Sequence, residues 1–263
     1  MKVRRGIRLM VGLLLVLAAV WGLPPAAAHA ESDVDADGLA DELEDALAAR
    51  FFPWVWFDSG EDPGCTDPAT STNPGTALVR VRPHPADPDK IAMLYVILYR
   101  RDCGDWFGGA HHGDVEPFSI TVARNDTCPY GYGAFSLKTI AHEGTLAEHI
   151  DERMLGNSCT GGGSPAGITI YAAENKHANY ASDASCDAGA FYQDNCSESF
   201  TRAFGVYNVG EDGARRLDEL SEYQFPGEYA WSAVLFCGSL SRTSNAGYVR
   251  QKLLSDRLLA RAG

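Results

Sequence analysis

Alternation of apolar and polar residues marks the middle of the chain and predicts β-strands. It runs through residues 76–82 and returns in residues 114–122. Successive side chains of a strand point to opposite faces, so a period of two predicts strands with one buried face. Residues 91–99 are almost wholly apolar, which predicts a central strand covered on both faces.

Other segments add further strands and a few helices. Four more strands are expected at residues 51–57, 132–140, 168–173 and 200–209. Helices are expected at residues 39–50, 212–223 and 247–262. Leu39, Leu43 and Leu47 give the first helix an apolar stripe, and Pro53 stops it. The pattern predicts one mainly β domain with a short N-terminal helix and a C-terminal helix.

The first 30 residues have the features of a secretory signal peptide. Four basic residues precede the apolar run of residues 10–23, and Ala28-His29-Ala30 offers a cleavage site. We therefore expect a secreted, extracellular protein that begins at Glu31. No later stretch is long and apolar enough to predict a transmembrane segment in the mature chain.

The net charge of the chain limits the classes of partner that it can bind. The full chain carries a net charge of −13, and residues 1–30 hold four positive charges and no acidic residue, so the mature chain carries −17. Such a protein is a poor candidate for binding nucleic acid, whose backbone is also negative. A cation is a better-matched partner. We expect the mature protein to be a monomer.

Seven cysteines lie in the mature part, and export makes disulfides the default. No C-x-x-C pair occurs, which disfavours a zinc ribbon or a thioredoxin-type site. We expect three bridges and one free thiol. Cys186 with Cys196 and Cys128 with Cys159 are the predicted pairs, although spacing alone does not decide connectivity.

The mature chain opens with an acidic segment that matches the calcium loop of an EF-hand. Within residues 33–44, carboxylates fall at loop positions 1, 3, 5, 9 and 12, and Gly38 falls at position 6. The predicted ligands are Asp33, Asp35, Asp37, Leu39 through its carbonyl, Asp41 and Glu44. We expect this loop and its helix, residues 31–50, to bind Ca²⁺ as a structural staple. The alternative is an acidic segment in which Asp37 caps the helix.

A second acidic group lies at the start of the strand predicted for residues 114–122. Asp114 and Glu116 fall on the same face as the apolar Phe118. Two inward carboxylates are costly unless they are paired or bind a cation. An oxygen-rich set favours Mg²⁺, Ca²⁺ or Mn²⁺. The predicted pocket ligands are His111, Asp114, Glu116, Asp102 and Asp105. The alternative is a pair of solvated carboxylates beside polar loop histidines.

Three more polar residues are candidates for the same pocket. His142 follows the strand at residues 132–140, and His142-Glu143 lacks the second histidine of a zinc-protease motif because Leu146 occupies that position. Lys176 and His177 follow the strand at residues 168–173, where a sandwich gathers polar groups at its rim. A hydrogen-bonded loop is the alternative for Lys176.

Short motifs resemble the necrosis- and ethylene-inducing-peptide-like secreted proteins. A-H-H-G-D-V-E at residues 110–116 resembles that family's heptapeptide G-H-R-H-D-W-E, and residues 140–144 are similar to its S-x-H-G segment. Residues 170–180 resemble the Y-V-A-x-G-x-H-A-S-Y segment of the related vacuolar protein sorting sixty-two family. The resemblance spans roughly residues 50–240, but only these short pieces are specific.

This resemblance implies a single-domain β-sandwich over residues 51–263 with a divalent cation in an acidic pocket. His111, Asp114 and Glu116 match the family's metal ligands, with Asp102 or Asp105 as an upstream aspartate whose spacing fits less well. Gly113 and Val115 replace the heptapeptide's second His and its Trp. The resemblance therefore does not imply the membrane-damaging activity of the family's cytolytic members.

Three functional hypotheses follow. The first is a toxin- or effector-like binding protein whose cation helps to hold a carbohydrate or a lipid head group. The second is a metal-dependent hydrolase with His142 or His177 as general acid or base. The third is a structural exoprotein held together by calcium. No G-x-S-x-G motif is present, which disfavours a serine hydrolase. The sequence leaves open whether the protein is an enzyme.

Overall fold

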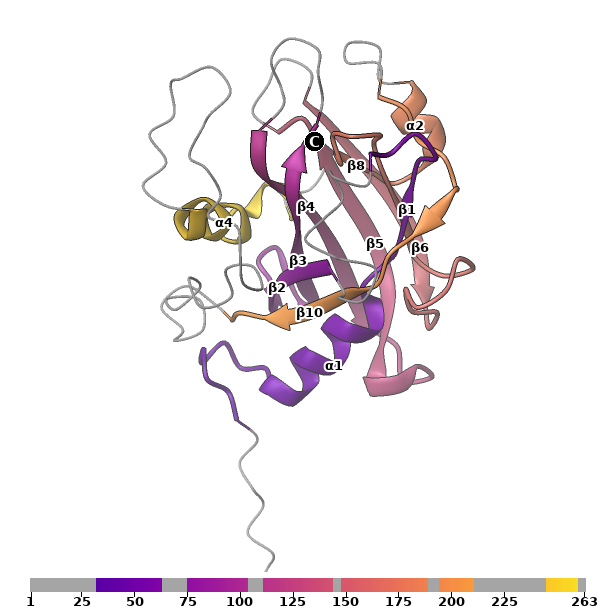
Figure 1. Cartoon of the computed structure of the whole chain (residues 1–263). Helices are drawn as coiled ribbons and strands as arrows, with labels where there is room; N and C mark the ends of the chain where they lie inside the picture. Colours follow the sequence, from indigo (N-terminus) through magenta and orange to yellow (C-terminus); the bar gives the residue numbers. More distant parts are fainter. Residues whose placement is uncertain are drawn as a thin grey trace, which may run out of the picture. The chain divides into compact units, whose positions relative to one another are not determined.

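Two β-sheets form the framework of the computed structural model (Figure 1). It describes residues 32–62, 75–103, 111–143, 148–188, 194–210 and 245–259, all within one compact unit, Glu31–Gly263. The backbone alone is described for residues 76, 100, 101, 111–113 and 245–248. The predicted signal peptide and the helix expected at residues 212–223 lie outside the described residues.

The larger sheet has six strands in the order β10-β2-β3-β4-β5-β6. Its strands are β2 (Gly75–His84), β3 (Asp87–Asp102), β4 (His111–Arg124), β5 (Tyr132–Ala141), β6 (His149–Ser158) and β10 (Phe204–Asn208). Neighbouring strands are antiparallel except that β10 runs parallel to β2 at one edge.

The smaller sheet has four short strands in the order β8-β7-β1-β9. They are β1 (Trp54–Phe57), β7 (Thr169–Ala172), β8 (Asn179–Tyr180) and β9 (Phe200–Thr201). β1 and β7 are parallel, while β8 and β9 pair antiparallel with their neighbours.

The main hydrophobic core lies between the two sheets. Val55, Phe57 and Ile170 of the smaller sheet pack in one cluster with Tyr95 and Phe118 of the larger sheet. Tyr95 and Phe118 stack at 4.9 Å between ring centroids. The predicted mainly β sandwich is therefore confirmed, with its apolar faces turned toward each other.

β3 is buried on both faces, as its apolar run predicts. Tyr95 and Ile97 face the core between the sheets. Val96 and Leu98 face the opposite side, where the C-terminal helix α4 (Asn245–Leu253) covers them with Leu253 and its neighbours. Figure 1 shows α4 beside the larger sheet. Residues 91–99 of this strand are apolar because each face packs against another layer.

Helix α1 (Asp41–Phe51) closes one end of the sandwich core. Leu47, Ala48 and Phe51 are buried, and the Tyr95 hydroxyl donates a hydrogen bond of 2.9 Å to the Ala48 carbonyl. The helix ends two residues before Pro53, which confirms the expected stop.

Several boundaries differ from the sequence-based expectation. The strand expected at residues 200–209 is divided into β9 and β10, which join different sheets. The C-terminal helix ends at Leu253 and is followed by the 3₁₀ turn η4 (Asp256–Leu258), where the Ser255 hydroxyl accepts from the Arg257 amide. A short helix, α2 (Asp183–Asp187), and the 3₁₀ turn η2 (Pro129–Gly131) occupy loops.

β6 was not predicted because its sequence is largely polar. It is the edge strand of the larger sheet, and it leaves Ile150 and Met154 exposed. An edge strand that buries little apolar surface carries no strong hydrophobic alternation. Backbone pairing with β5 therefore defines this strand.

Two predicted disulfides are present, Cys128–Cys159 and Cys186–Cys196. Cys103 is also disulfide-bonded, while Cys65 and Cys237 lie outside the described residues. In the part of the chain that the structure describes, no helix has the length and apolar character to cross a membrane.

The two disulfides are expected to stabilise the fold to different extents. Cys128–Cys159 closes a separation of 31 residues and Cys186–Cys196 one of 10. Since the longer loop loses more entropy in the unfolded chain, replacing the first pair by serine should lower the free energy of unfolding by about 4 kcal/mol and replacing the second by about 3 kcal/mol. Denaturant unfolding of both double variants measures this order. A larger loss for Cys186–Cys196 would contradict it.

Candidate functional site

The start of β4 places two carboxylates against the sandwich core. Asp114 pairs with Tyr99 and Glu116 with Ile97 of β3, residues that face the main core cluster. Asp114 is buried and Glu116 is partly buried. The two carboxylates lie on the same face of the strand as Phe118, as the alternation predicted.

His177 binds one of these carboxylates from the loop between β7 and β8. Its Nδ1 lies 3.1 Å from Asp114 Oδ2, and its Nε2 lies 2.9 Å from Glu61 Oε1. The imidazole is fully buried and stacks on the Tyr99 ring, with 4.0 Å between centroids. The His177 backbone has a φ of +58° and donates a hydrogen bond to the Ala173 carbonyl, so a tight turn directs the ring inward.

The two hydrogen bonds set the charge of this histidine. Burial alone would lower the pKa of His177, but the hydrogen bonds to Asp114 and Glu61 raise it to about 9. At neutral pH the ring is therefore an imidazolium that donates from both nitrogens. Glu61, His177 and Asp114 form a buried ion triad.

The triad does not return the pKa of the Glu116 carboxyl to its usual range. Burial, followed by the neighbouring charge of Asp114, holds the pKa of the Glu116 carboxyl well above its usual range. His177 pairs with Glu61 and Asp114, while the charge of Lys252 acts on Glu116 in the opposite direction and lowers its pKa. The raised pKa means that the Glu116 carboxyl favours its neutral form, and a bound cation would instead favour the ionised form.

Glu61 is part of the site, although the sequence pattern did not indicate it. It follows β1 in a turn where the Gly60 amide donates to Asp58 Oδ1 at 2.7 Å. Glu61 Oε2 accepts from the Asn175 amide at 2.8 Å, which ties this turn to the loop that carries His177. A carboxylate in a turn-rich segment has no periodicity to mark it, and its partner lies 116 residues away in the chain.

The other predicted pocket ligands are described only in part. β4 begins at His111, and its backbone pairs with Asp102 at the end of β3. Asp102 is partly buried and its charge contributes to the raised pKa of Glu116. The His111 side chain and the whole of Asp105 lie outside the described part of the chain. The predicted pocket metal ligation stays a prediction.

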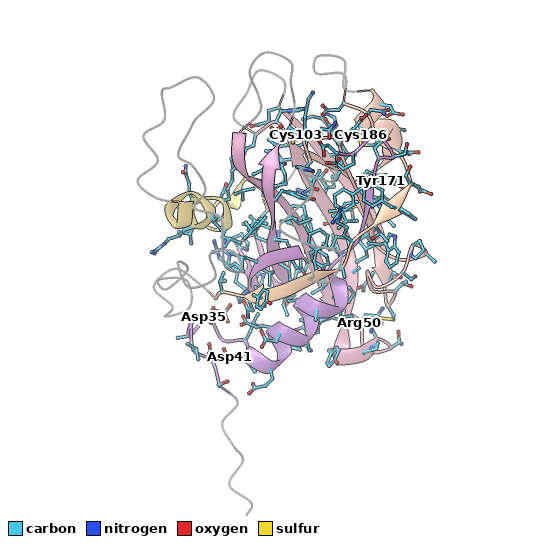
Figure 2. All side chains as sticks on the ribbon, in the orientation of Figure 1. Asp35, Asp41, Arg50, Cys103, Tyr171 and Cys186 are labelled. Atoms are coloured by element: carbon cyan, nitrogen blue, oxygen red, sulfur yellow. A yellow bond between two sulfur atoms is a disulfide. The ribbon has the colours of Figure 1, made fainter. Side chains whose placement is uncertain are left out.

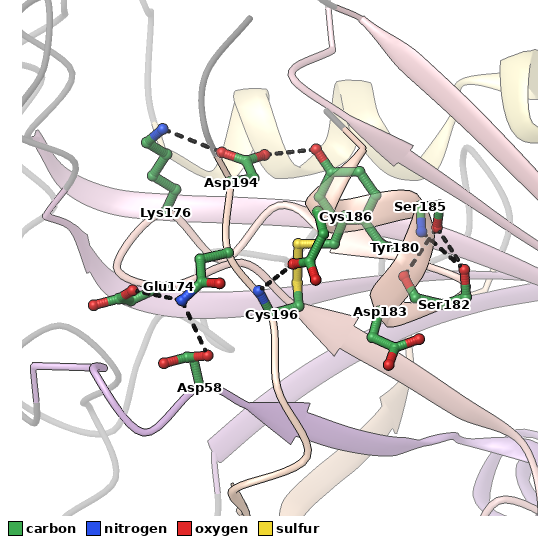
Figure 3. The surroundings of a disulfide bond; sticks show 12 residues. Asp58, Glu174, Lys176, Tyr180, Ser182, Asp183, Ser185, Cys186, Asp194 and Cys196 are labelled. Carbon is green, nitrogen blue, oxygen red and sulfur yellow. Dashed lines mark hydrogen bonds and ion pairs between the residues drawn. A yellow bond between two sulfur atoms is a disulfide. The ribbon is translucent and has the colours of Figure 1, made fainter. Parts of the chain in front are cut away.

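A second polar cluster surrounds Asp194. His142 Nε2 lies 2.6 Å from Asp194 Oδ2, and the Tyr180 hydroxyl donates to the same oxygen at 2.5 Å. Lys176 Nζ donates to Asp194 Oδ1 at 3.1 Å, and Figure 3 shows Asp194 between Lys176 and Tyr180. The structure thus joins the predicted residues His142 and Lys176 through an aspartate that the sequence pattern did not indicate.

The Asp194 cluster keeps this carboxylate ionised. Burial would raise the pKa of Asp194, but the hydrogen bond and charge of His142, together with Tyr180 and Lys176, hold it below its usual range. The Cys186–Cys196 disulfide lies close by in the same loop (Figure 3) and limits its movement. His142 has a φ of +53° at the end of β5. A carboxylate-oriented histidine of this kind can accept or donate a proton.

The acidic loop before α1 gathers as its spacing predicted. Carboxylate oxygens of Asp33, Asp35 and Asp37 lie within 4.8 Å of one another, and so do those of Asp35, Asp41 and Glu44. Figure 2 shows Asp35 and Asp41 near each other beside the start of α1. Burial, together with the charges of nearby aspartates, raises the pKa of Glu44 to about 9. The ligation of Ca²⁺ by these residues and by the Leu39 carbonyl stays a prediction.

No protein-family model and no curated protein matches the sequence. Among solved structures, the chain is similar to one described as a toxin fold for microbial attack and plant defense, with a TM-score of 0.36 and 15% identity over 68% of this chain and 82% of that chain. It is similar to NLPPya in complex with mannosamine, with a TM-score of 0.38 and 13% identity over 70% of this chain and 81% of that chain.

A third similar structure is Necrosis and Ethylene inducing Protein 2 from the causal agent of cocoa's Witches Broom disease. Its TM-score is 0.36, with 13% identity over 61% of this chain and 72% of that chain. By its name, this protein belongs to the family that the sequence motifs resemble. At these TM-scores the likeness transfers neither a site nor a ligand to this chain.

Replacing His177 tests the buried ion triad. His177→Ala leaves Glu61 and Asp114 without their shared cation, so the free energy of unfolding at pH 6 should fall by about 3–5 kcal/mol. The matched control is His149→Ala, because His149 is exposed. Urea unfolding of both variants measures the difference, and equal losses would contradict the triad.

The pH dependence separates the ion triad from simple packing. The pKa of His177 is raised from 6.5 to about 9 on folding, so its stabilising contribution is complete below pH 6.5 and is lost as pH rises toward 9. The difference in unfolding free energy between the wild-type protein and His177→Ala should therefore shrink across this interval. A difference that stays constant with pH would assign the loss to packing alone.

Proposed function

We propose that this protein is exported and binds a divalent cation at Asp114 and Glu116, and that the cation helps to hold the polar head group of a glycan or glycolipid. A toxin- or effector-like role outside the cell is the corresponding biological class. The observation that carries the proposal is a pair of inward carboxylates. Asp114 pairs with the imidazolium of His177, whereas the neighbouring Glu116 keeps a raised pKa.

The charge balance of the site supports a cation. Glu61 and Asp114 share the imidazolium of His177. Glu116 is partly buried next to Asp114, and burial and the charge of Asp114 raise the pKa of its carboxyl. A divalent ion would favour the ionised form of Glu116. Carboxylate oxygens suit Mg²⁺, Ca²⁺ or Mn²⁺, and Asp102, Asp105 and His111 are the further candidate ligands.

The surroundings of the carboxylates support a hydroxyl-rich ligand. Hard cations keep coordination positions for water, and hydroxyl or phosphate oxygens can replace that water. Lys176 adjoins His177 in the chain, and its ammonium and His142 lie on either side of Asp194. These groups form a polar cluster that includes the neighbour of His177, and donors and acceptors of this kind orient a polar head group.

Two observations support export. Residues 1–30 have the pattern of a signal peptide, and the described chain contains the disulfides Cys128–Cys159 and Cys186–Cys196. Disulfides persist in oxidising compartments, which agrees with a protein that acts outside the cell.

The cation claim is tested by titrating Mg²⁺, Ca²⁺ and Mn²⁺ into the chain from Glu31 by calorimetry. Glu44→Gln serves as the common background, since it removes one carboxylate of the acidic segment of residues 33–44. Binding should be measurable in this background and lost when Asp114→Asn and Glu116→Gln are added, because both change the charge at the pocket. Asp126→Asn, in an exposed turn, is the matched control and should bind as the background does. Binding that survives the pocket substitutions would overturn the proposal.

A metal-dependent hydrolase is the second candidate, and the His142–Asp194 pair favours it. A histidine oriented by a buried carboxylate is a common general base. Glycan-array binding followed by mass spectrometry of the bound sugars distinguishes the two functions. Intact sugars retained in a cation-dependent manner support the binding protein. Cleaved sugars whose release is abolished by His142→Ala support the hydrolase.

A further inference from the structure

The acidic segment of residues 33–44 runs from the loop before α1 into the first turn of that helix. Its last carboxylate, that of Glu44, is buried in the protein. Glu44 is 1% exposed, although it lies in the first turn of a helix with several acidic neighbours. Its Oε2 accepts a hydrogen bond of 2.9 Å from Asn208 Nδ2 of β10. Its Oε1 is buried and has no hydrogen-bond partner among the described residues.

The Glu44 carboxylate, one oxygen of which has no hydrogen-bond partner among the described residues, belongs to a group of acidic side chains. Oxygens of Glu44, Asp35 and Asp41 lie within 4.8 Å of one another, and Asp35 also belongs to the group with Asp33 and Asp37. Like charges at this separation repel one another, and a buried carboxylate oxygen without a donor is costly. A cation among these oxygens removes both costs.

We propose that this loop is a calcium site and that Asn208 of β10 holds Glu44, its last ligand, in the binding position. All side-chain donors of the site are oxygens, and the set exceeds what Mg²⁺ uses from a protein, which favours Ca²⁺. The proposal does not rest on the function proposed for the pocket at Asp114 and Glu116.

The backbone of the loop is folded as a site of this kind requires. Gly38, at the sixth loop position, has a φ of +94°, a conformation that side chains other than glycine rarely adopt. Asp33 accepts hydrogen bonds from the amides of Asp37 and Gly38, at 3.1 and 3.2 Å. These bonds close the loop around the carboxylates.

Asn208 is oriented by its own strand end. Its Oδ1 accepts from the Gly210 amide at 3.2 Å, so the amide nitrogen is the atom that faces Glu44. The next residue, Val209, donates its amide to the Val79 carbonyl of β2 at 2.8 Å. Asn208 is 7% exposed. It is a positioning residue, because it acts on the cation through Glu44.

The site therefore connects the N-terminal loop to the edge of the larger sheet. A small cavity lies between them, lined by Asp35, Asp41, Glu44 and residues 208–210. Calcium binding would hold the start of α1 against β10, which pairs in parallel with β2. Since the ligand binds only the folded loop, it should also raise the unfolding temperature of the whole domain.

The test is a calcium titration of the chain from Glu31, carrying Asp114→Asn and Glu116→Gln so that only the loop can respond. Calorimetry should give one bound Ca²⁺, and the unfolding temperature should rise with Ca²⁺. Glu44→Gln should abolish this binding. Asp45→Asn, which changes the exposed neighbouring acid, should leave the dissociation constant within about twofold. If Glu44→Gln does not fold, Asp33→Asn tests the same site without altering the core.

Asn208→Ala tests the positioning role. The dissociation constant for Ca²⁺ should rise about 10- to 100-fold, as for the loss of a group that orients a metal ligand. A residue that serves only the fold would lower the unfolding temperature of the calcium-free protein and leave the dissociation constant unchanged, which would overturn this role. Calcium binding that is absent from the parent protein, or unchanged by Glu44→Gln and Asp33→Asn, would overturn the site itself.

Discussion

The buried imidazolium of His177 is the interaction on which the candidate site depends. It bridges Glu61 after β1 and Asp114 on β4, and its ring stacks on Tyr99 of β3. One side chain thus connects the smaller sheet, the larger sheet and the loop between β7 and β8. Without its positive charge, two buried carboxylates would lose their ion pair, a cost comparable to much of the stability of a domain.

The same physical constraint, the cost of burying a carboxylate, applies to both acidic regions. At the pocket, Glu116 lies beside a carboxylate that His177 already neutralises, and at the N-terminal loop, Glu44 is neutralised in part by the amide of Asn208. Among the described residues, Glu44 Oε1 is buried without a hydrogen-bond partner, and burial raises the pKa of Glu116. We propose a divalent cation for both regions, because its charge and its preference for oxygen ligands match carboxylates.

Local patterns predicted much of the fold and part of the site. The alternation in β4 correctly placed Asp114 and Glu116 on the core face, and the apolar run of β3 predicted that both of its faces are covered. The same reasoning did not predict the structure of polar segments. β6 is specified by pairing at a sheet edge, and Glu61 lies in a turn whose composition resembles any exposed loop.

The sequence by itself determined the strand faces, the stop of α1 at Pro53 and the calcium-type spacing of the first acids. Only the tertiary structure decided which groups face those acids. Glu61 with His177, Asp194 with His142 and Asn208 with Glu44 are each separated by 52 residues or more. Periodicity reports the face on which a side chain lies, whereas its partner across the core is set by how the sheets and loops pack.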